Sequence, residues 1–427
     1  MPKLENEVRD AVGGFIRFNS FEKDLIDTMP VQRLRHINQL ALTSFVYPGA
    51  THKRFEHSLG VMDLAGKVFE CVCRSACKDA EVRDRLGVEL GEPLEHEHWK
   101  QTVRAAALLH DVGHLPFSHA AEKQLLPDGW SHERLTADII RGDEIASSLE
   151  KRCLSPDQVV KLACDPRKPG VEANLSEWEA ILNEMITGDT FGVDRMDYLL
   201  RDSVHLGVPY GRFDPLRLID SLTIVVDPGV GQCALAVEEG GLHGAEALLL
   251  ARYFMYTQVY FHDVRRVYDK HLQQFLIKWL PGGRFPTDWR EYTRLTDNEV
   301  WAAIYASCGD PKHPCHAEAQ RIVKRQHYRT VCDWSLADEK AHPDLWNELE
   351  TELVSSCGDM ILTDRYQPRP GHAASFLVKR ENGDIVNSLA LSDVMKQLPD
   401  ATFGFIFADR SIEHEVANYL KDKLRNK

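Results

Sequence analysis

The run ALLHDVGHLPFSH, residues 107–119, limits the fold of this chain more than any other segment. An apolar stretch of helical character ends on the adjacent pair His110 and Asp111, and Gly113 and Pro116 then break the helix. An imidazole nitrogen beside a carboxylate oxygen suits a borderline divalent cation such as Mn, Fe, Co, Ni or Zn. Because two adjacent ligands do not hold an ion, the fold must bring further ligands to this helix end.

Candidate partner ligands lie in two distant segments, each at the start of a predicted helix. His57 stands in RFEHSLGV, and Asp194 stands in GVDRMDYLLRD. Four side chains on three helices are able to converge in the core of a helical bundle. Two imidazoles and two carboxylates leave open positions for water, which loses a proton near neutral pH when such a cation binds it. The pattern therefore predicts a metal site that supplies a hydroxide nucleophile.

The number of ionisable residues near this helix end favours a catalytic site over a structural role. A single histidine at the end of an apolar helix is more often a hydrogen-bonded core or cap residue than a ligand. Burying many such residues as structural filler is costly, however. Four histidines lie within 23 positions, namely His110, His114, His119 and His132, and the acidic residues Asp111 and Glu133 accompany them.

Helical periodicity dominates the chain from Phe21 to about Leu280, and this predicts a helical bundle that includes a long helix from His243 to Leu280. Within this part, TIVV and CALAV flank the turn-rich segment DPGVGQ and predict a β-hairpin. We therefore expect a mainly α fold, with a helical catalytic core over residues 1–280.

A small mixed α+β lobe is expected over residues 281–427, after the boundary segment PGGR that starts at Pro281. SFLVKR, a tight turn at Asn382 and Gly383, DIVNSLAL and FGFIF predict a sheet-forming region there. A helix from Ser411 to Leu424 is expected to close the chain.

The net charge of -14 argues against a general nucleic-acid-binding protein, because a surface of that sign repels long polyanions. A small anionic substrate is still compatible, since a few arginines in a pocket reverse the local potential. No stretch approaches the roughly 20 apolar residues of a membrane span. No signal-peptide pattern is visible, and ten irregularly spaced cysteines fit reduced thiols. A cytoplasmic location is therefore expected.

Three strings, RFEHSLGV, HDVGHLPFSH and DRMDYLLRD, in this order closely resemble the HD-domain triphosphohydrolases, which cleave deoxynucleoside triphosphates to deoxynucleoside and tripolyphosphate. The similarity continues upstream through QRLRHINQL and VYPGATHKRFEH, and downstream through RIVKRQHYR and SLALSDVMKQLP. It covers most of the chain and implies an HD-type helical bundle. It also implies a homo-oligomer, since related enzymes are dimers or tetramers.

Carried over to this sequence, the resemblance implies roles for eight residues around the cleaved bond. A divalent metal (Mn, Fe, Mg, Ni, Co or Zn) would be bound by His57, His110, Asp111 and Asp194. His119 would be the general acid that protonates the departing sugar oxygen, with Glu122 positioning it. His114 and His132 would contact phosphate.

The resemblance also implies a set of substrate-binding residues. Arg54, Arg195, Arg252 and Tyr198 would hold the triphosphate. Gln39 would contact the 3'-hydroxyl, Leu40 would crowd the 2'-position, and Tyr260 would pack on the ribose. On pattern alone, Leu40 and Tyr260 are better read as core residues at helical spacing. An arginine is usually a solvated helix-face charge, but Arg54 and Arg195 stand in motifs beside proposed ligands, which favours a functional role for them, whereas the pattern around Arg252 favours neither role.

Three alternatives stay open at this point. An HD phosphohydrolase or phosphodiesterase could act on another small nucleotide, such as a monophosphate, a cyclic nucleotide or an alarmone. A non-catalytic nucleotide-sensing module would not need His119 and Glu122 as a leaving-group acid and its partner. A single-strand nuclease would need an electropositive groove with stacking aromatics, and RIVKRQHYR is the clearest basic run available for one.

Overall fold

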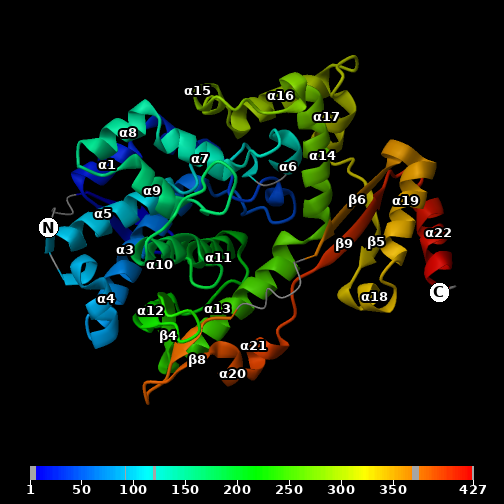
Figure 1. Cartoon of the computed structure of the whole chain (residues 1–427). Helices are drawn as coiled ribbons and strands as arrows, with labels where there is room; N and C mark the ends of the chain where they lie inside the picture. The colour runs from blue at the N-terminus through cyan, green and yellow to red at the C-terminus, as the bar shows by residue number, and fades with distance from the viewer. Residues whose placement is uncertain (1–5, 92, 119–121, 368–374, 426–427) are drawn as a thin grey trace.

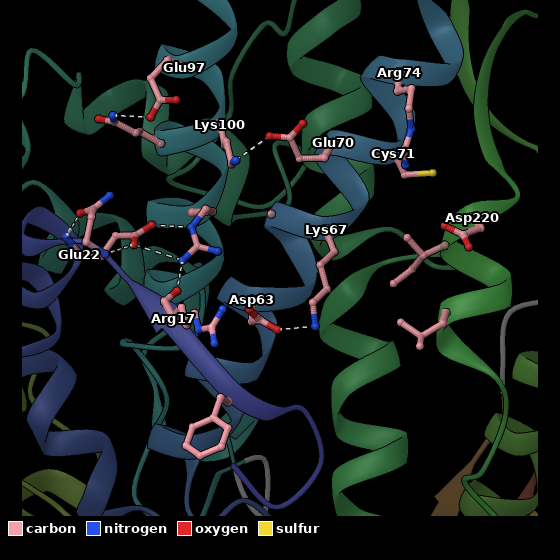
Figure 2. A pocket seen from close by; sticks show the side chains of 17 residues that line it. Arg17, Glu22, Asp63, Lys67, Glu70, Cys71, Arg74, Glu97, Lys100 and Asp220 are labelled. Carbon is pink, nitrogen blue, oxygen red and sulfur yellow. Dashed lines mark hydrogen bonds and ion pairs between the residues drawn. The ribbon is translucent and has the colours of Figure 1, made fainter. Parts of the chain in front are cut away.

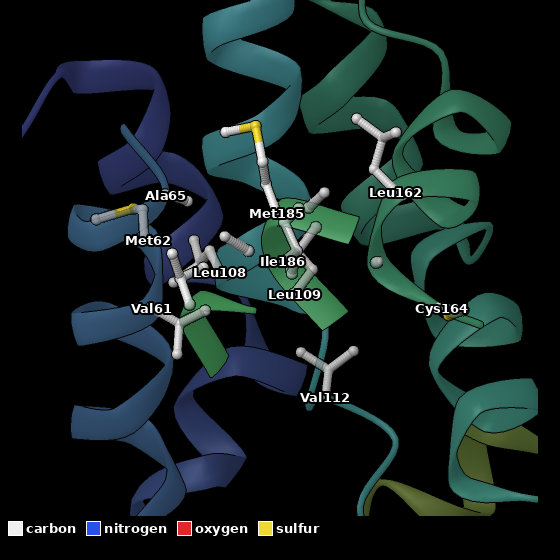
Figure 3. Packing of buried hydrophobic residues seen from close by; sticks show 14 of the residues in the cluster. Val61, Met62, Ala65, Leu108, Leu109, Val112, Leu162, Cys164, Met185 and Ile186 are labelled. Atoms are coloured by element: carbon white, nitrogen blue, oxygen red, sulfur yellow. The ribbon is translucent and has the colours of Figure 1, made fainter. Parts of the chain in front are cut away.

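Helices α3 (Arg54–Ala76) and α5 (Pro93–Leu109) pack against each other at the centre of the helical part. A computed structural model describes residues 6–91, 93–118, 122–367 and 375–425 of the chain (Figure 1). Every residue of α5 from Ala105 to Leu109 is fully buried, because neighbouring elements cover this end of the helix on all sides. Val61, Met62 and Ala65 of α3 face these residues in the core (Figure 3).

Shorter helices surround this pair and complete the bundle. Helix α10 packs on α3 and α5, and α11 packs on α3. Ser176 caps α10 by accepting from the backbone N–H of Glu179, which fixes where that helix begins. The surrounding helices are α1 (Ser20–Ile26), α2 (Met29–Arg33), α4 (Ala80–Gly91), α6 (Glu122–Leu125), α7 (His132–Ile140), α8 (Asp143–Glu150), α9 (Pro156–Ala163), α10 (Glu177–Thr187), α11 (Val193–Leu206) and α12 (Pro215–Asp220).

The expected long helix between His243 and Leu280 is interrupted, which corrects that prediction. Helix α13 (Leu242–Met255) passes into a π-helical turn at Tyr256–Tyr260, and α14 (Asp263–Trp279) begins after Phe261 and His262. The His262 side chain accepts from the backbone N–H of Val264 and so caps α14. Single π-helical turns often occur at functional sites. Helices α15 (Trp289–Tyr292), α16 (Asp297–Gly309) and α17 (His316–Val323) follow.

The predicted β-hairpin is confirmed as β3 (Leu222–Val226) and β4 (Cys233–Glu238), which pair antiparallel. The strands predicted near the C-terminus do not form one sheet. Strand β7 (Leu377–Lys379) pairs in parallel with β4 and antiparallel with β8 (Ile385–Asn387), so these strands extend the hairpin into a sheet of order β3-β4-β7-β8. The SLAL segment after β8 is helical, as α20 (Ser388–Leu391), and α21 (Asp393–Gln397) follows.

A separate sheet of order β5-β9-β6 forms the C-terminal part. Its strands are β5 (Arg329–Trp334), β6 (Ile361–Tyr366) and β9 (Phe403–Ala408), with α18 (Leu336–Ala341), α19 (Leu345–Cys357) and α22 (Glu413–Arg425) beside them at the right of Figure 1. Phe403, Phe405 and Phe407 cluster with Val267 of α14, whereas the alternate residue Ile406 clusters with α19 and α22. The remaining hairpin pairs β1 (Asn6–Asp10) with β2 (Gly14–Phe18).

Hydrophobic contacts continue across the boundary expected at Pro281. Leu280, Phe285 and Ile304 belong to one buried cluster that extends from Ile16 to Met395. The division into residues 1–280 and 281–427 therefore remains a prediction. The fold class, a mainly α bundle with a small mixed α+β C-terminal lobe, is confirmed. Among the described residues, no helix is both long and apolar enough to cross a membrane.

We predict that truncating the α5 core is strongly destabilising. Leu108 is fully buried, so Leu108→Ala removes apolar contacts and leaves a cavity, at a cost of about 2–5 kcal/mol in the free energy of unfolding. Leu216→Ala, the same deletion at a side chain that is 63% exposed, should change it by less than about 0.5 kcal/mol. Urea denaturation measures both, and equal effects would contradict the assigned core.

Candidate active site

Three helices bring the predicted metal ligands together. Nitrogen and oxygen atoms of His57, His110 and Asp194 all lie within 4.8 Å of one another. His57 stands one turn into α3, His110 directly follows α5, and Asp194 is in the first turn of α11. The fourth predicted ligand, Asp111, places its carboxylate oxygens 3.6 Å from His57 Nε2 and 3.3 Å from His110 Nε2.

Outer contacts orient both imidazole rings toward this cluster. His110 Nδ1 lies 2.7 Å from the carbonyl oxygen of Ala107, and a carbonyl only accepts, so Nδ1 carries the proton. His110 Nε2 is buried, and no hydrogen-bond partner is found for it among the described residues. His57 Nδ1 likewise donates to Asp197 Oδ2 at 2.8 Å, with Nε2 directed at Asp194. Such outer hydrogen bonds are typical of histidines that ligate a metal through Nε2.

Asp197 is itself held in place by a buried guanidinium group. Arg201 donates to both carboxylate oxygens of Asp197, at 2.8 and 2.9 Å, and to Asp10 at 2.6 Å. Gly60 of α3 permits this arrangement, because a Cβ atom at that position would lie 2.0 Å from an Asp197 oxygen. The close approach of Gly60 and Asp197 fixes the distance between α3 and α11 near His57.

The electrostatics of the cluster favour a bound cation. Burial alone would lower the pKa of His57, but its hydrogen bonds to Asp194 and Asp197 raise that pKa to about 10. Burial would raise the pKa of Asp194, yet the nearby His110 and His57 hold it below its usual range. The carboxylates therefore stabilise positive charge at this point. Two imidazoles and two carboxylates around one space fit a divalent cation, which would replace the Nε2 proton of His57.

A second group of histidines lies beside the first. His114 Nε2 is 3.0 Å from Asp111 Oδ1, and its ring stacks on His132 with centroids 4.1 Å apart. Glu122 accepts from the backbone N–H and from the ring Nδ1 of His132, both at 2.8 Å. Burial would lower the pKa of His132, but Glu122 raises it. His119 lies outside the described residues, so its expected contact with Glu122 stays a prediction.

A pocket of about 800 Å³ opens directly onto these groups. This size is ample for a small ligand. Among the described residues, His57 does not line the pocket and is buried behind it, and Arg252 and Glu122 are also outside its lining. The other predicted residues line it: Gln39, Leu40, Arg54, His110, Asp111, His114, His132, Asp194, Arg195, Tyr198 and Tyr260.

The predicted arginines differ in how they are held. Arg54 is buried, forms an ion pair with Asp111, and donates through Nε to Ser118 Oγ at 2.9 Å. Arg195 donates to the Gly188 carbonyl at 3.1 Å and pairs with the exposed Asp189 at 3.2 Å. Both guanidinium groups therefore face the pocket in fixed orientations.

Arg252 lies further out than the other two arginines. Its Nη1 is 3.5 Å from the Asp189 carbonyl, and its guanidinium lies 5.6 Å from the Tyr256 ring. Arg252 therefore lies beside Tyr256, which does line the pocket.

Another part of the pocket lining combines an apolar side chain with a polar network. Leu40 is buried in the wall next to Gln39, whose Oε1 has no hydrogen-bond partner among the described residues. The Tyr260 hydroxyl donates to Asp202 at 2.6 Å, and His52 Nε2 lies 2.7 Å from the other Asp202 oxygen. This wall offers one unsatisfied acceptor beside an apolar surface.

Sequence reasoning missed several functional candidates. Asp197 and Asp202 stand in the quoted string DRMDYLLRD, one and two helical turns beyond Asp194, so helical spacing was a usable signal. Glu184 lines the pocket, and burial raises its pKa to about 7. Arg265 also lines the pocket, and no local motif marks it.

A second pocket of about 800 Å³ lies between α3, α5 and α12 (Figure 2). Its acids and bases are largely paired with each other. Asp63 pairs with Lys67 at 2.7 Å, and Glu22 pairs with Arg104 at 2.5 Å. No histidine is found among the described residues that line this pocket, so the chemistry points to the His57 cluster.

Comparison with protein families agrees with this geometry. An HD domain matches residues 54–202, which include all four predicted metal ligands. An HD associated region matches residues 213–358, which include α13 to α19.

Curated relatives match much of the chain. An uncharacterised protein, MJ1154, of Methanocaldococcus jannaschii is 34% identical over 64% of this chain and 49% of its own length. The deoxynucleoside triphosphate triphosphohydrolase SAMHD1 of Homo sapiens is 30% identical over 76% of this chain and 54% of its own length. This chain thus spans about half the length of these relatives.

A solved structure shares the whole fold. The crystal structure of a hypothetical protein from Aquifex aeolicus, at 32% identity, superposes with a TM-score of 0.78 and covers 97% of this chain and 99% of its own. The chain belongs to the HD-domain family, with an HD domain followed by an HD associated region, and the SAMHD1 triphosphohydrolases are among its homologues.

Proposed function

We propose that this HD-family phosphohydrolase converts deoxynucleoside triphosphates to deoxynucleoside and tripolyphosphate in a metal-dependent reaction. The observation that carries the proposal is the four-ligand cluster of His57, His110, Asp111 and Asp194, which adjoins a pocket lined by arginines. Kinship with SAMHD1, whose name states this activity, supports the choice of substrate.

The proposed metal ligands are His57, His110, Asp111 and Asp194. A divalent cation bound there supplies an activated water for attack on phosphorus. His119 is proposed to protonate the departing sugar oxygen, with Glu122 as its positioning partner. His114 and His132 are proposed to contact the phosphate next to the cleaved bond, and their stacked rings place them beside Asp111.

The triphosphate is proposed to lie against Arg54, Arg195, Arg252 and Tyr198. The three arginines are held by fixed partners, so they need little reorganisation as negative charge builds up on the phosphates in the transition state.

The sugar is proposed to lie against Gln39, Leu40 and Tyr260. The unpartnered Gln39 Oε1 suits a 3'-hydroxyl donor. The apolar Leu40 side chain would leave a 2'-hydroxyl without a hydrogen-bond partner, which disfavours ribonucleotides.

Three further properties remain predictions. The proposed cofactor is a divalent cation, one of Mn, Fe, Mg, Ni, Co and Zn. We propose self-association as a dimer or tetramer from the family resemblance, and a cytoplasmic location from the sequence composition. Light scattering of the purified protein measures the oligomeric state.

We predict that the metal-loaded protein releases tripolyphosphate from deoxynucleoside triphosphates and acts more slowly on ribonucleoside triphosphates. The expected discrimination is about 10- to 200-fold in kcat/KM, the usual range for one small group against a pocket wall. Phosphorus NMR of the products, with each deoxy- and ribonucleotide in turn, measures it. Orthophosphate as the product would instead point to an HD enzyme with another reaction, and a linearised monophosphate formed from a cyclic nucleotide would point to an HD phosphodiesterase.

We predict that His110→Ala combined with Asp111→Ala abolishes both metal binding and turnover, because half of the ligand set is lost. Circular dichroism should show retained helical content, and elemental analysis of the dialysed protein should show loss of the bound metal. His243→Ala serves as the control, since the His243 side chain is 92% exposed and far from any predicted ligand in sequence. Turnover retained by the double variant would refute the assigned cluster.

A further inference from the structure

The loop that follows His110 and Asp111 has a backbone conformation that its own residues disfavour. It covers residues 112–118, and Phe117 and Ser118 have positive φ angles of 57° and 59°. A bulky residue in the left-handed region is strained and persists there only when its surroundings hold it. The contacts that hold this loop therefore determine where its side chains lie.

Tyr292, at the end of α15, holds one side of the loop. Its buried hydroxyl donates to the Gly113 carbonyl at 2.8 Å. The Arg33 guanidinium lies over the Tyr292 ring, 4.8 Å from its centroid. Arg33 in turn donates to the carbonyls of Val112 at 3.3 Å and His114 at 3.1 Å. Three successive carbonyl groups of the loop are thus held by side chains from elsewhere in the chain.

Asp297, the first residue of α16, holds the other side of the loop. One carboxylate oxygen accepts from the backbone N–H of Phe117 at 2.7 Å, within the strained pair. The other oxygen accepts from the backbone N–H of Asn38 at 2.8 Å. The carboxylate is almost fully buried. A single side chain thus links the loop to the segment that immediately precedes Gln39.

The loop carries side chains that shape the pocket. His114 contacts Asp111 and stacks on His132, so a shift of the loop would move this ring. The Ser118 hydroxyl accepts from Arg54 and donates to the Asn38 carbonyl at 2.8 Å. A displaced loop would therefore disturb both the stacked histidines and the arginine beside Asp111.

We propose that Tyr292 and Asp297 are positioning residues, through which the HD associated region sets the geometry of loop 112–118 for hydrolysis. Neither residue lines the pocket, and each acts on a backbone group of the loop. The inference rests on the proposed phosphohydrolase function, because small displacements of catalytic groups lower turnover steeply.

A purely structural role for these residues predicts a different outcome. Loss of a stabilising hydrogen bond alone lowers the melting temperature but leaves turnover per folded molecule unchanged. A positioning role lowers kcat more than it changes KM, because most of the proposed substrate-binding side chains lie outside the loop. It also loosens the loop locally, which amide hydrogen exchange detects.

The first test compares Tyr292→Phe with Tyr268→Phe. Both changes remove one hydroxyl from a fully buried tyrosine, but the Tyr268 hydroxyl has no hydrogen-bond partner among the described residues. Tyr292→Phe should lower kcat about tenfold with KM within about twofold. Exchange of the peptide that covers residues 112–118 should accelerate about fivefold, as expected for one lost hydrogen bond. Tyr268→Phe should change neither quantity.

The second test is Asp297→Asn, which keeps the size of the side chain but has only one acceptor oxygen. Its NH₂ group would face a backbone N–H, so kcat should fall about 100-fold, with mass spectrometry showing faster exchange in the same peptide. Unchanged kcat in both variants would overturn the proposal, whether or not exchange in the loop accelerates. If exchange accelerates but the wild-type protein hydrolyses no deoxynucleotide, the proposed function fails and the role of these residues in holding the loop stands.

Discussion

The buried ionic cluster around His57 is the constraint on which the helical part depends. Carboxylates from two segments, the residue pair after α5 and the start of α11, surround it, and guanidinium groups and imidazoles balance their charge. An unpaired buried charge costs several kcal/mol, so α3, α11 and the end of α5 cannot shift relative to one another without leaving one uncompensated. The residues involved are Asp111, Asp194, Asp197, Arg54 and Arg201. The same balance keeps two Nε2 atoms directed at a space that suits a cation.

The convergence of the proposed metal ligands could be predicted from sequence because each one occupies a recognisable local position. His110 and Asp111 follow an apolar helix, and Asp194 opens another, so their helices alone bring them near the bundle core. Asp197 was within reach of the same reasoning, since it lies one turn after Asp194. Its role depends on which residue of α3 faces it, however, and that partner, His57, is 140 residues away. Side-chain pairing over such distances is set by tertiary packing.

The pairing of β-strands was also hard to predict where it joins segments that are distant in the sequence. The hairpin of β3 and β4 was predictable because its turn is local. The pairing of β7 with β4 joins segments about 140 positions apart, and the pairing of β9 with β5 and β6 depends on two strands that carry no strong alternating pattern. The π-helical turn at Tyr256–Tyr260 was equally hidden, since its sequence continues a helical stripe. Local periodicity therefore predicts which class of fold forms but not which strands become neighbours.

The HD associated region contributes to the site in two ways: it lines part of the pocket, and it holds the backbone of loop 112–118. The π-helical turn that precedes α14 directs Tyr256 and Tyr260 into the pocket, and Tyr260 meets Asp202 of α11 there. Tyr292 and Asp297 do not line the pocket but bind backbone groups of Gly113 and Phe117, and no local sequence pattern marks either side chain as a partner of this loop. A strained loop needs fixed partners, and a helix start such as that of α16 provides a rigid one. The proposed catalytic residues and the HD associated region are therefore mechanically linked, because side chains from both parts of the chain hold loop 112–118.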